Sequence, residues 1–404
     1  MRLSSIKFSG LLIVVCSLAL SLLAAEAALR WLDKPPSLRV GWRWDASPYK
    51  SESNFGDHRT NQLGLRGRPF DYTDSDFVVV LVGDSYVEAG AQPFEDMPEQ
   101  ILEAAFAARG FKKRVKVYSI ASAGWGQDQE DLALERYFEK YRADLVIHWF
   151  TPVNDYWENT FIDRSVDAKA GPLKPTFRLQ PDRSLTLVES LASSSKLVEL
   201  VRIAWGRARL GSKATRNDIY AATWDRNLPS GTLVPVASSE CPASQIAELD
   251  MVEAYRRGLK TMTVVTEERV EEGRTHFSPF IRPTSAIEKY EIDLTHALLQ
   301  KMNGIATKNK ADFRIFYPKG SDIDVAVRHV KCVRRGDKFY RVEMNDLLEF
   351  LALTPLSEKI VPVTIASDKP SVLSSRDWHL NRFGNEEALA GLVDSLVHSG
   401  LKLQ

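Results

Sequence analysis

The stretch Phe77-Val-Val-Val-Leu-Val-Gly83, followed by Asp84 and Ser85, decides the fold that we expect for this chain. A short run without polar side chains is typical of a strand that is buried on both faces of a parallel sheet. The Gly-Asp-Ser that ends it is typical of a turn from a strand into a helix, with Asp or Ser as the cap. Because α/β proteins place their sites at the carboxyl ends of parallel strands, Ser85 is the first candidate functional residue.

Segments that resemble strands and helices alternate on both sides of this stretch. The other expected strands lie at residues 115–121, 144–150, 313–317 and 360–366. The expected helices lie at residues 93–109, 128–142, 286–308 and 384–399. This alternation predicts an α/β fold with three layers, in which helices cover both faces of a central parallel sheet.

The N-terminal region is apolar. Residues 8–25 contain no charged side chain and are long enough to cross a bilayer. We interpret residues 1–32 as a signal anchor, that is, an N-terminal transmembrane helix. A cleaved signal is the alternative, because Ala25-Glu26-Ala27 resembles a signal-peptidase site. Both interpretations export the remainder, which is then membrane-anchored and periplasmic, or secreted if the signal is cleaved.

The rest of the chain divides into a linker and a folded body. Residues 33–60 are rich in Pro, Ser, Asp and Arg without a clear period, which is typical of a tether. Residues 61–404 are expected to form the α/β domain. An insertion interrupts this domain at about residues 160–285, where the alternation of strands and helices is lost.

Composition excludes several classes of protein. Lys plus Arg and Asp plus Glu both number 53 in the 404 residues, so the formal net charge is zero. The lack of a basic excess argues against nucleic acid as a partner. Three cysteines are too few for a zinc site with four Cys ligands. Cys16 lies in the apolar run, whereas Cys241 and Cys332 either form a disulfide in an oxidising compartment or remain two separate thiols.

Three further loops carry residues with related chemistry. Gly124 follows the second expected strand, and glycine lets a backbone N–H approach a ligand closely. Asn154 follows the third, and its amide can donate a hydrogen bond to an oxyanion. Near the C-terminus, His379 can take a proton from a serine hydroxyl, and Asp377 can orient the imidazole. Taken alone, each residue also has an ordinary interpretation in a turn, a cap or the surface.

Aromatic side chains crowd these loops. They either stack on sugar rings or pack the core and cap of the sheet. They are Tyr86, Trp125, Trp149, Phe150, Tyr156, Trp157 and Trp378.

Taken together, Ser85, Gly124, Asn154 and the Asp377/His379 pair resemble the motif blocks of the SGNH (GDSL-type) hydrolase superfamily. The order along the chain is that of the family, with the serine in a GDS motif and the histidine near the C-terminus. The glycine that the family places ahead of its asparagine is missing here. The acid lies two residues before the histidine instead of the family's usual three.

Other segments resemble particular branches of this superfamily. Residues 61–67 (Asn-Gln-Leu-Gly-Leu-Arg-Gly) and 122–129 (Ser-Ala-Gly-Trp-Gly-Gln-Asp-Gln) are similar to a bacterial, membrane-anchored branch. The Asp-x-His spacing at Asp377 and His379, followed by Asn and Gly, is similar to alginate O-acetyltransferase-like proteins. The resemblance covers roughly residues 60–160 and 286–400.

The resemblance implies a flavodoxin-like SGNH fold and a two-step serine mechanism. Ser85, Asp377 and His379 are then the catalytic residues, and Ser85, Gly124 and Asn154 form the oxyanion hole. The implied function is a serine-dependent ester hydrolase or O-acyltransferase that acts on O-acylated carbohydrate outside the cytoplasm, without a metal or an organic cofactor. A lipase-like or thioester hydrolase, and a non-catalytic component of a polysaccharide assembly complex, are the alternatives. The membrane is an expected partner through the N-terminal helix, while protein partners, the acyl group and its acceptor stay open.

Overall fold

The computed structural model describes most of the chain. The described residues are 3–32, 59–163, 173–188, 191, 195–230, 233–248, 273–275, 277, 280–319, 330–343, 355–365, 370–374 and 377–400. The linker predicted at residues 33–60 therefore lies almost entirely outside the described residues.

A five-stranded sheet forms the centre of the fold, and its strands run in the order β11-β8-β3-β1-β2. Every neighbouring pair in this sheet is parallel. The strands are β1 (Phe77–Gly83), β2 (Val115–Ala121), β3 (Leu145–Trp149), β8 (Asp312–Lys319) and β11 (Ile360–Thr364). Numbered along the chain within this sheet, the order is 2-1-3-4-5, which is the flavodoxin-like arrangement. The predicted central parallel sheet is confirmed.

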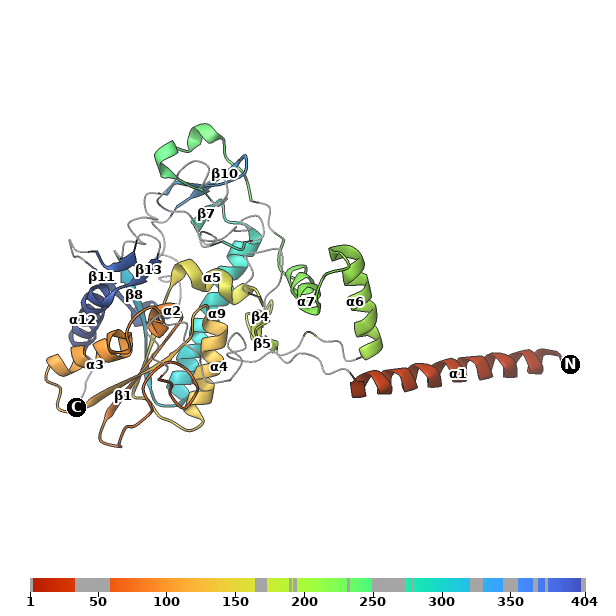
Figure 1. Ribbon diagram of the computed structural model, residues 1–404, viewed down its shortest axis with the longest axis horizontal. Coiled ribbons are helices and arrows are strands. Elements are labelled where there is room, and N and C mark those ends of the chain that lie inside the picture. The colour runs from red at the N-terminus through yellow and green to blue at the C-terminus, as the bar shows by residue number, and fades with distance from the viewer. Residues whose placement is uncertain are drawn as a thin grey trace.

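Helices cover both faces of this sheet, as predicted, and produce three layers (Figure 1). On one face, Val79 and Leu81 pack in a core with α3 (Pro98–Ala108) and α12 (Arg382–His398). On the other face, Val78, Val80 and Val82 pack with α4 (Gln127–Phe138) and α9 (Ala286–Lys308). Successive side chains of β1 point to opposite faces of the sheet, so its buried residues are divided between two cores.

One predicted helix begins later than expected. Residues 93–109 were expected to form a helix from Pro93, but a 3₁₀ turn (Phe94–Asp96) comes first and α3 begins at Pro98. Proline is favoured at the first helical position because its fixed φ suits the helix and its missing N–H is not needed there. Met97 precedes it in an extended conformation, as residues before proline usually do.

The region of the predicted insertion holds its own helices and strands. They are the hairpin β4 (Thr176–Leu179) and β5 (Leu185–Val188), then α6 (Lys196–Leu210), α7 (Arg216–Asp225), two 3₁₀ turns (Ser238–Glu240 and Ala243–Gln245), β6 (Ile246–Glu248) and β7 (Ile281–Arg282).

A second sheet joins this region to a later part of the chain. Its order is β6-β9-β10-β7, and β9 (Cys332–Arg335) and β10 (Lys338–Val342) lie between β8 and β11 in sequence. A disulfide links Cys241 to Cys332 across 91 positions. Of the two alternatives that the sequence left open, a disulfide or two separate thiols, the structure has the disulfide. Cys16 is the free cysteine among the described residues.

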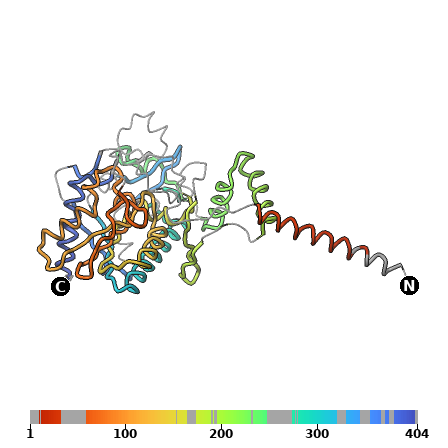
Figure 2. Tube along the Cα trace, turned by 60° about the horizontal axis from the view of Figure 1, so that its bottom comes forward, coloured from red at the N-terminus to blue at the C-terminus, as the bar shows by residue number. Residues whose placement is uncertain are grey.

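The remaining elements flank the central sheet. They are α1 (Leu3–Leu32), α2 (Ser85–Glu88), α5 (Pro152–Thr160), the 3₁₀ turn Ser357–Lys359, β12 (Val372–Ser374) and β13 (Asp377–Leu380). In α1, residues Leu12–Leu32 are long and apolar enough to cross a membrane, and none of this segment is buried in the rest of the protein. Figure 1 and Figure 2 show α1 extending away from the folded body.

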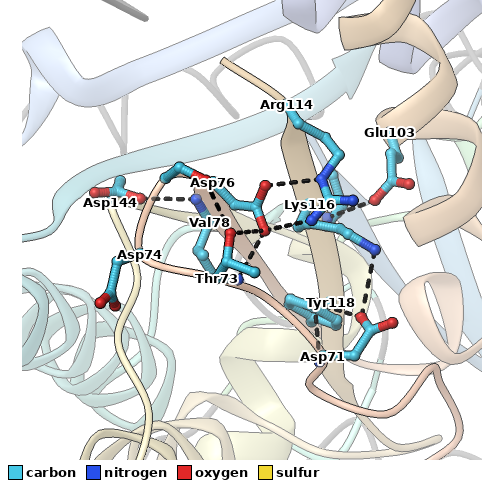
Figure 3. Close-up of polar contacts among 12 residues, drawn as sticks. Asp71, Thr73, Asp74, Asp76, Val78, Glu103, Arg114, Lys116, Tyr118 and Asp144 are labelled. Atoms are coloured by element: carbon cyan, nitrogen blue, oxygen red, sulfur yellow. Dashed lines mark hydrogen bonds and ion pairs between the residues drawn. The ribbon is translucent and has the colours of Figure 1, made fainter.

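Charged residues connect the N-terminal ends of β1, β2 and β3 by hydrogen bonds (Figure 3). These ends lie at the edge of the sheet opposite its carboxyl edge. The Arg114 guanidinium donates two hydrogen bonds of 2.7 Å to the Asp76 carboxylate, which also accepts from the Thr73 backbone N–H. The Asp144 carboxylate accepts from the backbone N–H of Val78 at 2.7 Å. These contacts fix the start of β1 against β2 and β3.

Asp76→Asn is expected to lower the midpoint of thermal unfolding near neutral pH. The hydrogen bond from Arg114 is the main reason that the pKa of Asp76 lies well below its ordinary value. Stability from this carboxylate is therefore present above the ordinary pKa of 3.8 and is lost as the pH falls through the lower folded pKa. Thermal melts at a series of pH values should show the variant and the parent converging in acid. The control is Asp74→Asn. Asp74 is exposed and lies near Asp76 (Figure 3), so its substitution should change the midpoint of thermal unfolding little.

Candidate active site

The turn after β1 presents Ser85 at the carboxyl edge of the sheet. Asp84 caps α2, and its side chain accepts a 2.9 Å hydrogen bond from the backbone N–H of Tyr86. Gly83 is needed because a Cβ at this position would lie 2.5 Å from a methyl carbon of Val87. Ser85 itself is partly exposed, although Gly83, Asp84 and Val87 are buried. The local sequence thus folds into a turn that directs a hydroxyl out of a packed surface.

His379 meets this hydroxyl from the far end of the chain. Its Nε2 lies 2.8 Å from Oγ of Ser85, across 294 positions of sequence. The Tyr86 ring packs against the imidazole with 4.8 Å between ring centroids. A hydrogen bond of this length lets the imidazole take the hydroxyl proton directly. The structure therefore brings together the two residues that the sequence named as nucleophile and base.

Asn154 lies in the first turn of α5, directly after β3. Its Nδ2 donates a 3.0 Å hydrogen bond to the carboxylate of Asp84. Burial raises the pKa of Asp84, and the nearby Glu158 raises it further, while the hydrogen bonds from Tyr86 and Asn154 oppose this. An amide NH₂ carries two donors, so one N–H positions the amide beside the serine turn and the other is a candidate for a ligand.

Gly124 lies in the loop after β2, at the same edge of the sheet. β1 and β2 pair Gly83 with Ala121, so the serine turn and this loop begin at the same level. Gly124 has φ of +71°, a left-handed conformation that favours glycine. The backbone N–H of Ala123 donates to the Glu88 carboxylate of α2, which holds the loop against the serine turn.

Asp377 occupies the start of β13, two residues before His379, where its backbone pairs with Ser374 of β12. Its side chain lies outside the described residues. Its predicted role of orienting the imidazole therefore stays a prediction, as do the oxyanion roles of Ser85, Gly124 and Asn154.

Two residues that the sequence analysis did not name as functional brace the site. The guanidinium of buried Arg66 donates to the carbonyl oxygens of Glu88, Ala89 and Gln92, at 2.9, 2.6 and 2.7 Å. Basic side chains commonly satisfy the last carbonyls of a helix in this way. Gln92 in turn donates from Nε2 to the carbonyl of Leu380 at 2.6 Å. The loop after the serine turn is thereby tied to the strand that carries His379.

A buried acid–imidazole pair lies beneath the site. Nε2 of His148 is 2.8 Å from a carboxyl oxygen of Glu130, and both side chains are almost fully buried. Burial lowers the pKa of His148 to about 3. Burial also raises the pKa of Glu130 well above its ordinary range, with help from the nearby Asp84. Burial therefore disfavours the charged form of both side chains.

Most of the aromatic residues near the loops pack inside the protein. They are Trp125, Trp149, Phe150, Tyr156 and Trp157, each 2% exposed or less. Their interpretation as core residues therefore holds, and sugar stacking by them is excluded in this conformation. Tyr86 is half-buried beside His379, and the Trp378 side chain lies outside the described residues.

Within the described ranges, no cluster of three or more His, Cys, Asp or Glu side chains is arranged to hold a metal ion.

Comparison with known protein families and with curated proteins finds no match to this chain. Among solved structures, the chain is similar to a lipase/acylhydrolase from Enterococcus faecalis, with 12% sequence identity and a TM-score of 0.23. That comparison covers 80% of this chain and 96% of the other. The fold assignment rests on the strand order and the two helical layers of this chain.

Proposed function

We propose that this protein is a serine-dependent acyl-ester enzyme of the SGNH type. The observation that supports it most is the 2.8 Å contact between Nε2 of His379 and Oγ of Ser85 at the carboxyl edge of the parallel sheet. Two residues so distant in sequence meet at the position where α/β proteins place their sites. The resemblance of the Gly-Asp-Ser and Asp-x-His motifs to the SGNH superfamily supports the same assignment.

The first half of the proposed reaction forms an acyl-enzyme. Oγ of Ser85 attacks the ester carbonyl carbon while Nε2 of His379 takes the hydroxyl proton. The resulting oxyanion accepts hydrogen bonds from the Ser85 and Gly124 backbone N–H groups and from the Asn154 amide. One such donor is worth about 3–4 kcal/mol of transition-state stabilisation. The ester C–O bond then breaks, and His379 returns the proton to the leaving alcohol.

The second half releases the acyl group. His379 takes a proton from an incoming hydroxyl as the oxygen of that hydroxyl attacks the acyl carbonyl carbon. The bond between this carbon and Oγ of Ser85 then breaks, and His379 returns the proton to Oγ. Water as the acceptor makes the protein a hydrolase, and a sugar hydroxyl makes it an O-acyltransferase. We propose O-acylated carbohydrate as the substrate class, on the basis of the resemblance to alginate O-acetyltransferase-like proteins.

We further propose that this reaction takes place outside the cytoplasm. The apolar helix α1 supports export as an anchor or a signal. The Cys241–Cys332 disulfide supports the same side, because disulfides persist in oxidising compartments and are rare in the cytosol.

Turnover of chromogenic esters tests the proposed function. We expect the full-length protein in detergent to release p-nitrophenol from p-nitrophenyl acetate, with less activity on butyrate and longer chains. Addition of acetylated and unacetylated oligosaccharides should then distinguish hydrolysis from acetyl transfer by product mass. A preference for long acyl chains would instead support the lipase-like alternative. Absence of both turnover and transfer would contradict the proposal.

Gln92→Ala is expected to lower kcat about 10-fold with little change in KM, because a small misplacement of a catalytic group is costly while substrate contacts remain. The variant removes the hydrogen bond to the Leu380 carbonyl that positions the His379 strand. Steady-state kinetics on p-nitrophenyl acetate measure the effect. Gln180→Ala, in the β4–β5 hairpin, is the matched control. Unchanged kcat in Gln92→Ala would show that this tie does not position the imidazole.

A further inference from the structure

Helix α6, in the region of the predicted insertion, presents an apolar strip to solvent. Val198, Val201 and Trp205 form this strip and expose 54, 70 and 62% of their surface. Their spacing of three and four residues places them on one side of the helix. The opposite side carries buried Glu199, which accepts a hydrogen bond from the hydroxyl of Tyr220 in α7. The protein thus covers one side of α6 and leaves the apolar side uncovered.

The same helix is bound at its N-terminus by α1. The Glu26 carboxylate accepts hydrogen bonds from the backbone N–H groups of Lys196 and Leu197, at 2.9 and 3.0 Å, and from the Ser195 hydroxyl at 2.9 Å. Arg30, one turn further along α1, donates to the same carboxylate at 2.7 Å. A carboxylate at a helix N-terminus is a favourable cap, so these hydrogen bonds join α1 to α6.

The position of Glu26 in α1 determines the depth at which α6 lies relative to a membrane. Glu26 directly follows the uncharged residues 8–25. The N-terminus of α6 therefore lies where the apolar part of α1 gives way to charged residues, on the side of the folded body. In both Figure 1 and Figure 2, α6 runs across the line of α1 and does not continue it. With the uncharged residues 8–25 of α1 across a bilayer, α6 consequently runs along the bilayer surface.

Basic residues lie at the C-terminal end of the apolar strip. Arg207, Arg209 and Lys213 are exposed at the end of α6 and just beyond it. The Arg209 guanidinium lies 5.3 Å from the ring centroid of Trp205. Tryptophan is enriched at the boundary between lipid and water, and clustered Lys and Arg side chains attract anionic headgroups.

We propose that α6 is an interfacial helix that binds the anionic lipid surface of the membrane spanned by α1. The apolar strip enters the boundary between headgroups and acyl chains, and the basic residues contact lipid phosphates. With α1 and α6 both in contact with lipid, the α/β body is held in a fixed orientation over the bilayer. This inference requires that α1 is retained, because cleavage after Ala27 would remove Glu26. It does not depend on the ester chemistry.

Fluorescence quenching tests the proposal in the full-length protein in nanodiscs that contain phosphatidylglycerol. A Cys16→Ser background leaves the disulfide pair as the other cysteines, so Val201→Cys can carry a single environment-sensitive fluorophore. Ala107→Cys, exposed on α3 and far from α1 in both views, is the matched control. The parent protein labelled at Cys16 reports that α1 is inserted. Nitroxide-labelled lipids probe contact with the bilayer, and iodide probes contact with water.

We expect the nitroxide lipids to remove most of the fluorescence at position 201 and little at position 107, and iodide to show the reverse order. Quenching at 201 by iodide alone would overturn the proposal, because α6 would then face water. Protection of 201 from both quenchers would also overturn it, because another protein or a second copy would cover the strip.

Glu26→Ala provides an independent variant for the joint between α1 and α6. The substitution removes the cap and should reduce lipid quenching at position 201 several-fold, while quenching at Cys16 stays unchanged in the matching single-cysteine protein. An unchanged signal at 201 would show that Glu26 does not set the level of α6.

Discussion

Ser85→Ala is expected to lower kcat for p-nitrophenyl acetate about 10⁴- to 10⁶-fold, the scale seen when the nucleophile of a serine triad is removed. The alanine cannot form the acyl-enzyme, so turnover by this route ends. The residual rate comes from the remaining donors around the oxyanion. Because Ser85 is partly exposed and has the imidazole as its described side-chain partner, the fold should tolerate the change.

Ser75→Ala is the matched control for this experiment. Ser75 is exposed beside Thr73, at the opposite end of β1 from Ser85. Its variant should keep the parental kcat and KM. If Ser85→Ala retained parental turnover while the control behaved as expected, Ser85 would not be the nucleophile.

His379→Gln is expected to have the second largest effect, a fall in kcat of about 10³- to 10⁵-fold, because the general base of a serine mechanism is nearly as important as the nucleophile. Glutamine can still hydrogen-bond to Oγ of Ser85 but cannot accept its proton at neutral pH. KM should change little, since the variant keeps the shape of the site. Stopped-flow measurement of the first turnover should show that acylation itself has slowed.

His398→Gln provides the control for the histidine variant. His398 is exposed at the end of α12, where its Nδ1 contacts the Asp394 carbonyl at 2.6 Å. A parental rate in this variant would show that loss of a histidine alone does not reduce activity. A rate in His379→Gln as high as in His398→Gln would mean that another group takes the serine proton.

The central sheet could be predicted from the sequence because its strands are continuous apolar runs. β1 and β3 are buried along their whole length, and such segments have few alternative structures. The second sheet could not be predicted in this way. β6 and β7 are three and two residues long and pair with strands from a distant part of the chain. Strands this short carry no readable period.

The sequence predicted part of the candidate site but not the residues that brace it. Ser85 and His379 were recognised by their motifs, and the structure then placed their side chains in contact. Arg66 and Gln92 were not recognised as bracing residues, because their partners are backbone carbonyls. A carbonyl has no signature in the sequence, since every residue carries one. Only the folded chain shows which carbonyls converge on one guanidinium.

Covalent labelling of the nucleophile tests the central claim most directly. The full-length protein is treated with a fluorophosphonate probe, digested, and analysed by peptide mass spectrometry. We predict one probe adduct per chain, on Ser85, with labelling strongly slowed in His379→Gln and abolished in Ser85→Ala. An adduct on another residue, or ester turnover that persists without any adduct on Ser85, would contradict the assignment of Ser85 and His379 as the reacting pair.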